Sequence, residues 1–342
     1  MLKGGRLMLK KVLFLALLLW SEAFCFECRI YNVGQANFVI IRHSDYCLII
    51  DCGKKRNMNQ SDDKKFFASV IGFIGDSHKS LVITHQHDDH YNFVNSISTS
   101  EGFRGFDYIL IGNLRSEKTA GELSSLPNVL FCEVAKGGLI KNVRDVERLS
   151  IDEEVGQLSA NTLQGCLGGD VGIQLLLPDE RAGNHEHDQN LVLKVTYQGK
   201  SILFPGDASG KLLEKIYQDG KDVLLDRVNC ILLSHHGSND SGELEWFRQV
   251  IQRNCRQTLT IVSSDPTGRH ALPWNMVKNL GLMGGYVSSH QISVRGQSGG
   301  NPLQVQTTQP LFTTCDTDLY YAITIDNGNG AVIMTDKDGN VF

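Results

Sequence analysis

One short segment of the chain carries several residues that could bind metal ions. It runs His85-Gln86-His87-Asp88-Asp89-His90, with a His-x-His-x-Asp-His pattern at the end of an apolar run. Imidazole nitrogens and carboxylate oxygens are the ligands that zinc and similar divalent ions take in proteins. A lone histidine is more often structural, but packing rarely explains so many ligand types in one loop. The segment therefore predicts a metal site.

Residues of the same types lie next to other apolar runs in the second half of the chain. They are His187, Asp207, His235, His236 and His270. The two oxygens of a carboxylate can bind two ions, so Asp207 could bridge a pair of metals. Taken alone, a Gly-Asp pair after a strand indicates a turn, and a solvated polar loop explains the segment around His187 equally well. The case for Asp207 and His187 as metal ligands therefore depends on the His85–His90 cluster.

A second apolar run ends in Asp51, and three basic residues follow it. The Asp51 carboxylate could orient a ligand imidazole from behind or, equally well, cap the turn. Lys54, Lys55 and Arg56 could contact phosphates near such a site. A solvated charge run is the commoner interpretation of such a triplet.

Strands and helices must bring these residues together. Short apolar runs predict strands over residues 29–33, 38–41, 47–50, 81–84, 108–111, 129–133, 172–177, 191–197, 201–204, 230–234 and 259–263. Helical spacing of apolar residues predicts helices over residues 65–74, 91–97, 209–217, 243–252 and 276–280. Two successive halves of sheet and helix predict an α/β fold, a four-layer α/β/β/α sandwich, with a β-rich tail over residues 303–342.

The first 25 residues predict a secretory signal peptide. Lys10 and Lys11 precede the apolar segment Val12–Trp20, which is too short to cross a bilayer. We expect cleavage, export to the periplasm or the medium without stable membrane insertion, and one domain over residues 26–342; an uncleaved anchor is the weaker alternative. The nine cysteines would allow up to four disulfides in an oxidising compartment, or remain buried thiols.

The charge balance limits the kinds of partner. The formal net charge of the chain is −5, although its first 25 residues are basic. The remainder therefore lacks the general positive field that attracts nucleic acid. A nuclease of this composition would need local phosphate contacts.

The motifs together resemble those of metallo-β-lactamase-fold hydrolases, and more narrowly those of the hydrolase domain of the competence protein ComEC. They run in the same order through most of the chain. Tyr31–Ala36 is similar to the family's Asp-Val-Gly-Gln-Gly, Ile50–Gly53 to its Ile-Asp-Thr-Gly, and His235–Ser238 matches its His-His-Gly-Ser. Asn32 and Ala36 depart from the first motif. ComEC also has membrane-spanning segments that this chain lacks, so a role in DNA uptake does not transfer.

The resemblance implies a site for two divalent ions, with Zn²⁺ as the first choice and Mn²⁺ or Fe as alternatives. It implies that the first ion is held by His85, His87 and His187, and the second by Asp89, His90 and His270, with Asp207 bridging. Asp89 then also belongs to the catalytic centre. His235 or His236 would donate a proton to the leaving group or hold a phosphate oxygen, and Asp51 would orient a ligand.

Three functions fit this sequence. The first is an exported phosphodiesterase or nuclease, whose partner is nucleic acid or a small phosphodiester. The second is a hydrolase of carbon esters, thioesters or lactones that uses the same two ions. The third is a non-catalytic metal-binding effector, which the complete set of ligands argues against. A β-lactamase proper fits less well, because that group usually has Cys or Ser where Asp207 stands.

Overall fold

The computed structural model describes most of the chain after residue 25. The described residues are 26–55, 60–112, 123, 126, 129–133, 139–142, 167–177, 182–183, 185–219, 227–238, 243–253, 258–265, 272, 290–294, 303–307, 311–326 and 330–342. The predicted signal peptide and the predicted helix over residues 276–280 lie outside these ranges. None of the helices within the ranges is long and apolar enough to cross a membrane.

The first half of the chain builds most of a nine-stranded sheet. The order of its strands is β17-β16-β1-β2-β3-β4-β5-β6-β7. Their bounds are β1 Phe26–Tyr31, β2 Phe38–His43, β3 Tyr46–Cys52, β4 His78–Ile83, β5 Tyr108–Gly112, β6 Val129–Glu133, β7 Leu139–Asn142, β16 Tyr320–Ile325 and β17 Val332–Asp336. β3 to β6 are parallel neighbours, so their carboxyl ends lie at the same edge of the sheet.

The second half builds a six-stranded sheet in the order β15-β12-β11-β10-β9-β8. Its strands are β8 Val171–Leu176, β9 Val192–Tyr197, β10 Lys200–Phe204, β11 Val228–Leu232, β12 Leu259–Val262 and β15 Leu311–Thr313. β10, β11, β12 and β15 are parallel neighbours. A separate antiparallel pair consists of β13 (His290–Val294) and β14 (Leu303–Thr307).

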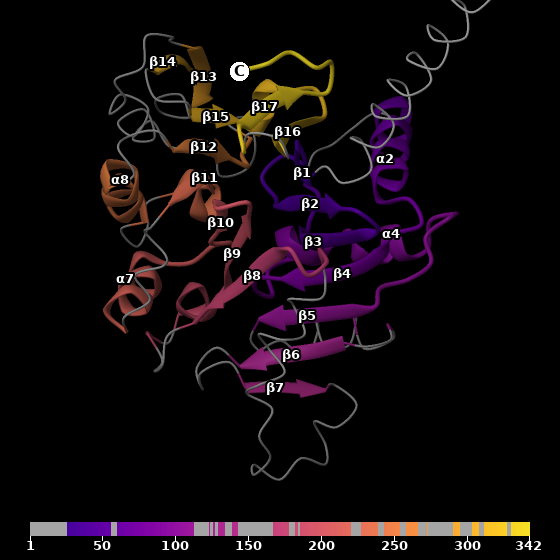
Figure 1. The fold of residues 1–342 in the computed structure, drawn as a ribbon, viewed down its shortest axis with the longest axis horizontal. Coiled ribbons are helices and arrows are strands. Elements are labelled where there is room, and N and C mark those ends of the chain that lie inside the picture. Colours follow the sequence, from indigo (N-terminus) through magenta and orange to yellow (C-terminus); the bar gives the residue numbers. More distant parts are fainter. Residues whose placement is uncertain are drawn as a thin grey trace, which may run out of the picture.

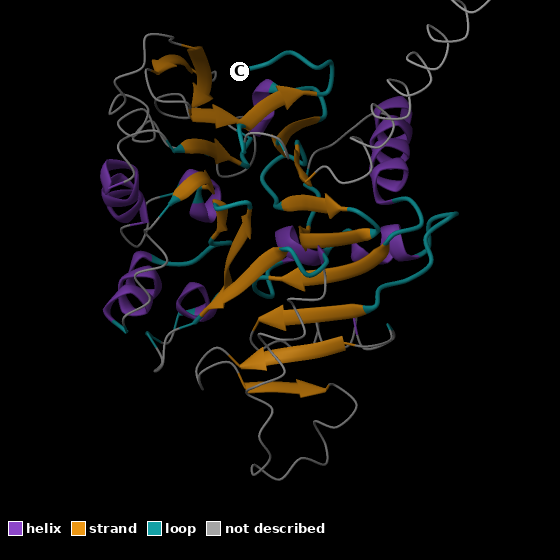
Figure 2. Cartoon of the chain, viewed as in Figure 1, coloured by secondary structure: helices purple, strands orange, loops and turns teal. Residues whose placement is uncertain are grey.

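The two sheets pack face to face, and helices cover their outer faces (Figure 1). The helices α2 (Gln60–Ile74), α3 (Asp88–Tyr91) and α4 (Val94–Ser98) contribute to a core on the first sheet. On the second sheet, α7 (Gly210–Gln218) and α8 (Glu243–Arg253) contribute to another. Figure 2 shows α2 to the right of the strands and α7 and α8 to their left. The predicted four-layer α/β/β/α sandwich is therefore confirmed.

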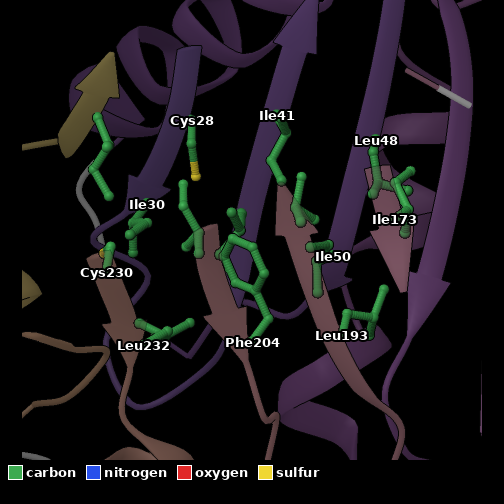
Figure 3. Close-up of a cluster of buried hydrophobic side chains, with 14 of the residues drawn as sticks. Cys28, Ile30, Ile41, Leu48, Ile50, Ile173, Leu193, Phe204, Cys230 and Leu232 are labelled. Carbon is green, nitrogen blue, oxygen red and sulfur yellow. The ribbon is translucent and has the colours of Figure 1, made fainter. Parts of the chain in front are cut away.

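The central core lies between the sheets. Figure 3 shows side chains such as Ile41 and Ile50 of the first sheet facing Leu193 and Phe204 of the second. Both faces of β3 are covered, and six of its seven residues are buried. Strands buried on both faces have continuous apolar runs rather than alternation, which explains the Cys47–Ile50 segment.

One prediction about the architecture needs correction, and another gains detail. The helix expected over residues 91–97 is divided, because α3 ends at Tyr91 and α4 begins at Val94. The tail is β-rich, as expected, and its strands join both sheets, since β16 pairs with β1 and β15 with β12.

The alternative expectation of buried thiols, rather than disulfides, fits the cysteines whose side chains the structure describes. Five cysteines are free thiols, namely Cys28, Cys47, Cys52, Cys230 and Cys315. All but Cys315 are buried, and burial raises the pKa of the Cys28 and Cys52 thiols well above the usual value. These cysteines thus behave as small apolar core residues.

Candidate metal centre

The predicted ligands meet at the carboxyl ends of strands from both sheets. In the first sheet, Asp51 lies near the end of β3 and His85 follows β4. In the second sheet, Asp207 follows β10 and His236 lies in the turn Ser234–Gly237 after β11. Loops at the carboxyl ends of parallel strands are where α/β folds place ligands.

Four of the predicted metal ligands form a first ligand group. His85, His87, His187 and Asp207 each offer an atom, and these atoms lie within 4.8 Å of one another. The centroid of the His87 ring lies 4.5 Å from that of the His85 ring and 5.2 Å from that of the His187 ring. His187 comes from the turn Glu186–Gln189, so the group joins the two halves of the chain.

Asp89, His90 and His236 form a second ligand group, whose ligand atoms also lie within 4.8 Å of one another. Asp207 lies between the two groups. Its Oδ1 is 3.3 Å from His90 Nε2, and its Oδ2 is 3.8 Å from both His85 Nε2 and His236 Nε2. The carboxylate of Asp207 is therefore placed to serve both groups.

The polar atoms of both groups fit a bound cation. Nε2 of His85, Nε2 of His236 and both ring nitrogens of His187 are buried without a hydrogen-bond partner among the described residues. A buried polar atom left unpaired costs roughly 1–3 kcal/mol, so such atoms together mark a place that can bind an ion, a ligand or water. Imidazole and carboxylate donors in groups of three and four suit zinc-like ions.

In the first ligand group, the environment also favours the protonation states that metal ligands need. Burial lowers the pKa of His187 to about 4 and that of His85 well below its usual value, so both rings are neutral. Burial alone would raise the pKa of Asp207, but the neighbouring His90 and His236 lower it well below its usual value. Deprotonated ligands bind metal without first releasing a proton. His90 of the second group differs: burial alone would lower its pKa, but Asp51 and Asp207 raise it well above its usual value, so this ring must release a proton to bind an ion.

Hydrogen bonds from behind orient two of the histidines. His90 Nδ1 donates to Asp51 Oδ2 at 2.7 Å, which turns Nε2 of His90 toward Asp207. Asp51 also accepts from the backbone N–H of Thr84 at 2.7 Å. His236 Nδ1 donates to the carbonyl of Ser263 at 2.9 Å, which leaves its Nε2 for the second ligand group. Such outer partners fix the tautomer of metal-binding histidines.

Three residues of the centre have left-handed backbone conformations. The φ angles are 56° for Asp51, 50° for His235 and 53° for His236. Non-glycine residues rarely adopt such angles, and their occurrence together at one place is a sign of a functional site. The consecutive left-handed residues send the rings of His235 and His236 to different neighbours.

Two of the predicted histidines, His235 and His236, lie at different ligand groups. His236 joins the second ligand group, where the resemblance implied His270, and His270 lies outside the described residues. His235 is half-buried and lies beside the first group, with its ring centroid 4.3 Å from that of His187.

The predicted phosphate-binding residues do not act together. Lys55 Nζ lies 3.2 Å from Asp89 Oδ2. The Lys54 ammonium instead pairs with Asp63 and lies 5.5 Å from the centre of the Phe93 ring. Arg56 lies outside the described residues. Of the triplet, the structure therefore brings Lys55 to the centre and gives Lys54 other partners.

Sequence reasoning missed the residues that hold the loops in place. Asn190 is fully buried, and its Oδ1 accepts from the backbone N–H of Asp207 at 3.0 Å. Thr84 Oγ1 donates to Asp51 at 3.0 Å. Gly206 has φ 57°, and a Cβ there would lie 2.6 Å from Thr84 Oγ1. A polar residue beside each predicted strand end was the one signal that could have found Asn190 and Thr84.

No protein-family model matches the chain, and no curated protein matches its sequence. Among solved structures, the chain is similar to the metallo-β-lactamase fold protein YhfI from Bacillus subtilis, with a TM-score of 0.42 and 12% identity over 72% of this chain and 89% of that one. It is also similar to a diphosphatase from the PhnP family, with a TM-score of 0.36 and 11% identity over 72% and 78% of the two chains. A mutant of the β-hydroxylase CmlA gives a TM-score of 0.35 and 16% identity over 60% and 35%. Because these TM-scores are below 0.5, the similarities carry no argument about function.

Proposed function

We propose that the chain is an exported metal-dependent hydrolase that cleaves phosphodiester bonds, as a phosphodiesterase or nuclease. The observation that carries this proposal is the position of Asp207, which belongs to the first ligand group and lies within 3.8 Å of His90 and His236 of the second. Pairs of ions held in this way are typical of phosphatases and nucleases. The ComEC-like motifs support the same class. Zinc is the first choice of metal because imidazole predominates among the ligands.

Each side chain has a role in this proposal. Bound ions would activate water and balance the charge that develops on the substrate. Asp51 holds the His90 ring and the Ser263 carbonyl holds the His236 ring, so both rings are oriented before substrate arrives. His235, next to His187, is placed to donate a proton to the leaving group or to hold a phosphate oxygen.

Charge near the centre supports an anionic substrate over a neutral ester or lactone. Lys55 lies beside Asp89 of the second group, and His235 beside His187 of the first. Cationic and proton-donating groups on both sides complement the charged oxygens of a phosphodiester. A nucleic acid or a small phosphodiester is therefore the proposed partner.

The test uses the purified chain with zinc or manganese. It is offered single-stranded DNA, bis-p-nitrophenyl phosphate and a panel of lactones, and bound metal is counted. We expect diester turnover that His87→Ala and Asp207→Ala each reduce by more than about 100-fold, since even residues behind metal ligands are worth about 10–100-fold. His78→Ala is the matched control, because His78 begins the strand that precedes the ligands and its side chain is 66% exposed.

Two outcomes would contradict the proposal. Turnover of lactones alone would assign the chain to the carbon-ester class. Stoichiometric metal binding without turnover of any substrate would favour the non-catalytic effector.

A further inference from the structure

We propose that Lys55 forms an anion subsite at the edge of the second ligand group, which binds a non-bridging phosphate oxygen of the substrate. This inference rests on the proposed function and adds to it the residue that selects anionic diesters over neutral esters.

The position of the ammonium group is the first support. Lys55 Nζ lies 3.2 Å from Asp89 Oδ2, and the same oxygen lies 3.6 Å from His236 Nε2. Asp89 and His236 both belong to the second ligand group. The Lys55 ammonium therefore reaches the point where the ligand atoms of that group converge.

Exposure makes Lys55 accessible to solvent, and therefore to a dissolved substrate. The side chain of Lys55 is 43% exposed, whereas that of Asp89 is 14% exposed and that of His236 1%. Among these three residues, the lysine is the most exposed. A group in this position can contact both a substrate and the centre.

The backbone around Lys55 is fixed by hydrogen bonds to two other segments. The N–H of Lys55 donates to the Val33 carbonyl at 2.8 Å. The N–H of Lys54 donates to Asn92 Oδ1 at 2.8 Å, just beyond α3. Gly53 N–H donates to the Asn37 carbonyl at 2.9 Å. The loop is thus bonded on one side to the segment between β1 and β2 and on the other to the end of α3. These bonds fix the backbone of Lys55 relative to the second ligand group.

Charge competition explains how the ammonium would become available. An ion and the Lys55 ammonium would share the carboxylate of Asp89, and ligation of an ion would reduce the negative charge that holds the ammonium. Lysine is a point charge on a flexible stem, so it can turn to another anion within reach. A phosphate oxygen meets this need, and a neutral ester does not.

The experiment compares Lys55→Ala and Lys55→Arg with Lys64→Ala, which removes an exposed lysine of α2. Binding of inorganic phosphate to the zinc-loaded full chain is measured by calorimetry, together with zinc affinity. We expect Lys55→Ala to weaken phosphate binding about 10-fold, as loss of one charge-assisted hydrogen bond predicts. Lys55→Arg should restore most of it, and Lys64→Ala should have no effect. Zinc affinity in Lys55→Ala should stay equal or rise, because a competing cation is removed.

Kinetics then separate substrate binding from chemistry. Lys55→Ala should raise KM for bis-p-nitrophenyl phosphate about 10-fold while kcat changes less than about threefold, as expected for binding that is uniform in ground and transition states. Hydrolysis of neutral p-nitrophenyl acetate should not change.

Equal phosphate affinity in wild type and Lys55→Ala would overturn the subsite even if the diester is cleaved. Loss of zinc from Lys55→Ala would also overturn it, because Lys55 would then act only by holding Asp89. Phosphate binding that depends on Lys55, without cleavage of any diester, would leave the subsite standing and reject the proposed function.

Discussion

At the scale of single residues, the metal centre depends on groups that do not face the metal. The Asp51 carboxylate accepts hydrogen bonds from His90 Nδ1 and from the backbone N–H of Thr84, each at 2.7 Å. One carboxylate therefore ties the start of the His85–His90 loop to its last histidine. Asp51 has a left-handed backbone conformation, with φ 56°. Such a conformation is strained in a non-glycine residue, and it persists only where the surrounding contacts stabilise it.

The first prediction tests this role of Asp51. Asp51→Asn keeps the shape of the side chain but removes the charge that supports the His90 ring. We expect the affinity for the second ion to fall about 10–100-fold, as for other residues that orient metal-binding histidines. The measurement is a metal titration against a competing chelator.

Asp170→Asn is the matched control for this prediction. Asp170 also pairs with a buried histidine, His43, at 3.0 Å, but neither residue belongs to a ligand group. Metal affinity should not change in this variant. Equal losses in both variants, or none in Asp51→Asn, would show that Asp51 does not support the centre.

At the scale of elements, the centre depends on how closely the end of β3 approaches α3. A Cβ added at Gly53 would lie 1.7 Å from the Asp89 carbonyl oxygen. The same carbonyl accepts the N–H of Asn37 at 3.0 Å, and Phe93 N–H donates to the Cys52 carbonyl at 2.9 Å. The backbone that carries Asp89 is thus packed against the loop that carries Lys55, with room at Gly53 for a hydrogen alone.

The second prediction concerns this contact. Gly53→Ala should lower the free energy of unfolding by about 1–3 kcal/mol, the usual cost of overpacking. It should also weaken metal binding, because Asp89 must move. Urea denaturation of the metal-free chain and a metal titration measure the two effects.

Gly72→Ala provides the control within α2. A Cβ at Gly72 would meet no atom within 4 Å. Because alanine is the better helix former, this variant should gain about 0.5–1 kcal/mol or stay unchanged, with normal metal binding. If Gly53→Ala behaved like Gly72→Ala, the close approach would have no energetic importance.

At the scale of the whole molecule, the sequence predicted ligands that are adjacent along the chain. It missed contacts that form only when distant segments come together. The His85–His90 pattern was recognisable because its ligands are adjacent along the chain, and Asp207 because it ends a strand. The presence of His236 in the second group depends on consecutive left-handed residues, which no spacing reveals. The role of Asn190 depends on a contact with Asp207, a residue 17 positions away.

The place of the last strands could not be predicted for the same reason. Alternation and turn residues predicted a β-rich end of the chain. The sequence of one segment, however, does not show which strands it pairs with. β16 lies between β17 and β1, so residues from the two ends of the chain are direct neighbours. Ile323 of β16 pairs with Cys28 of β1 and is fully buried in the core between the sheets.

The last prediction distinguishes an integral strand from an appended tail. Ile323→Ala should lower the free energy of unfolding by about 2–5 kcal/mol, because it leaves a cavity in the shared core. Ile333→Ala removes the same atoms from the neighbouring strand β17, where Ile333 is 36% exposed, and should cost no more than about 0.5 kcal/mol. Denaturant unfolding of both variants measures the difference. Equal, small losses would mean that β16 is a separable addition; a large loss for Ile323 alone would mean that the sheet carrying the metal ligands is completed by the end of the chain.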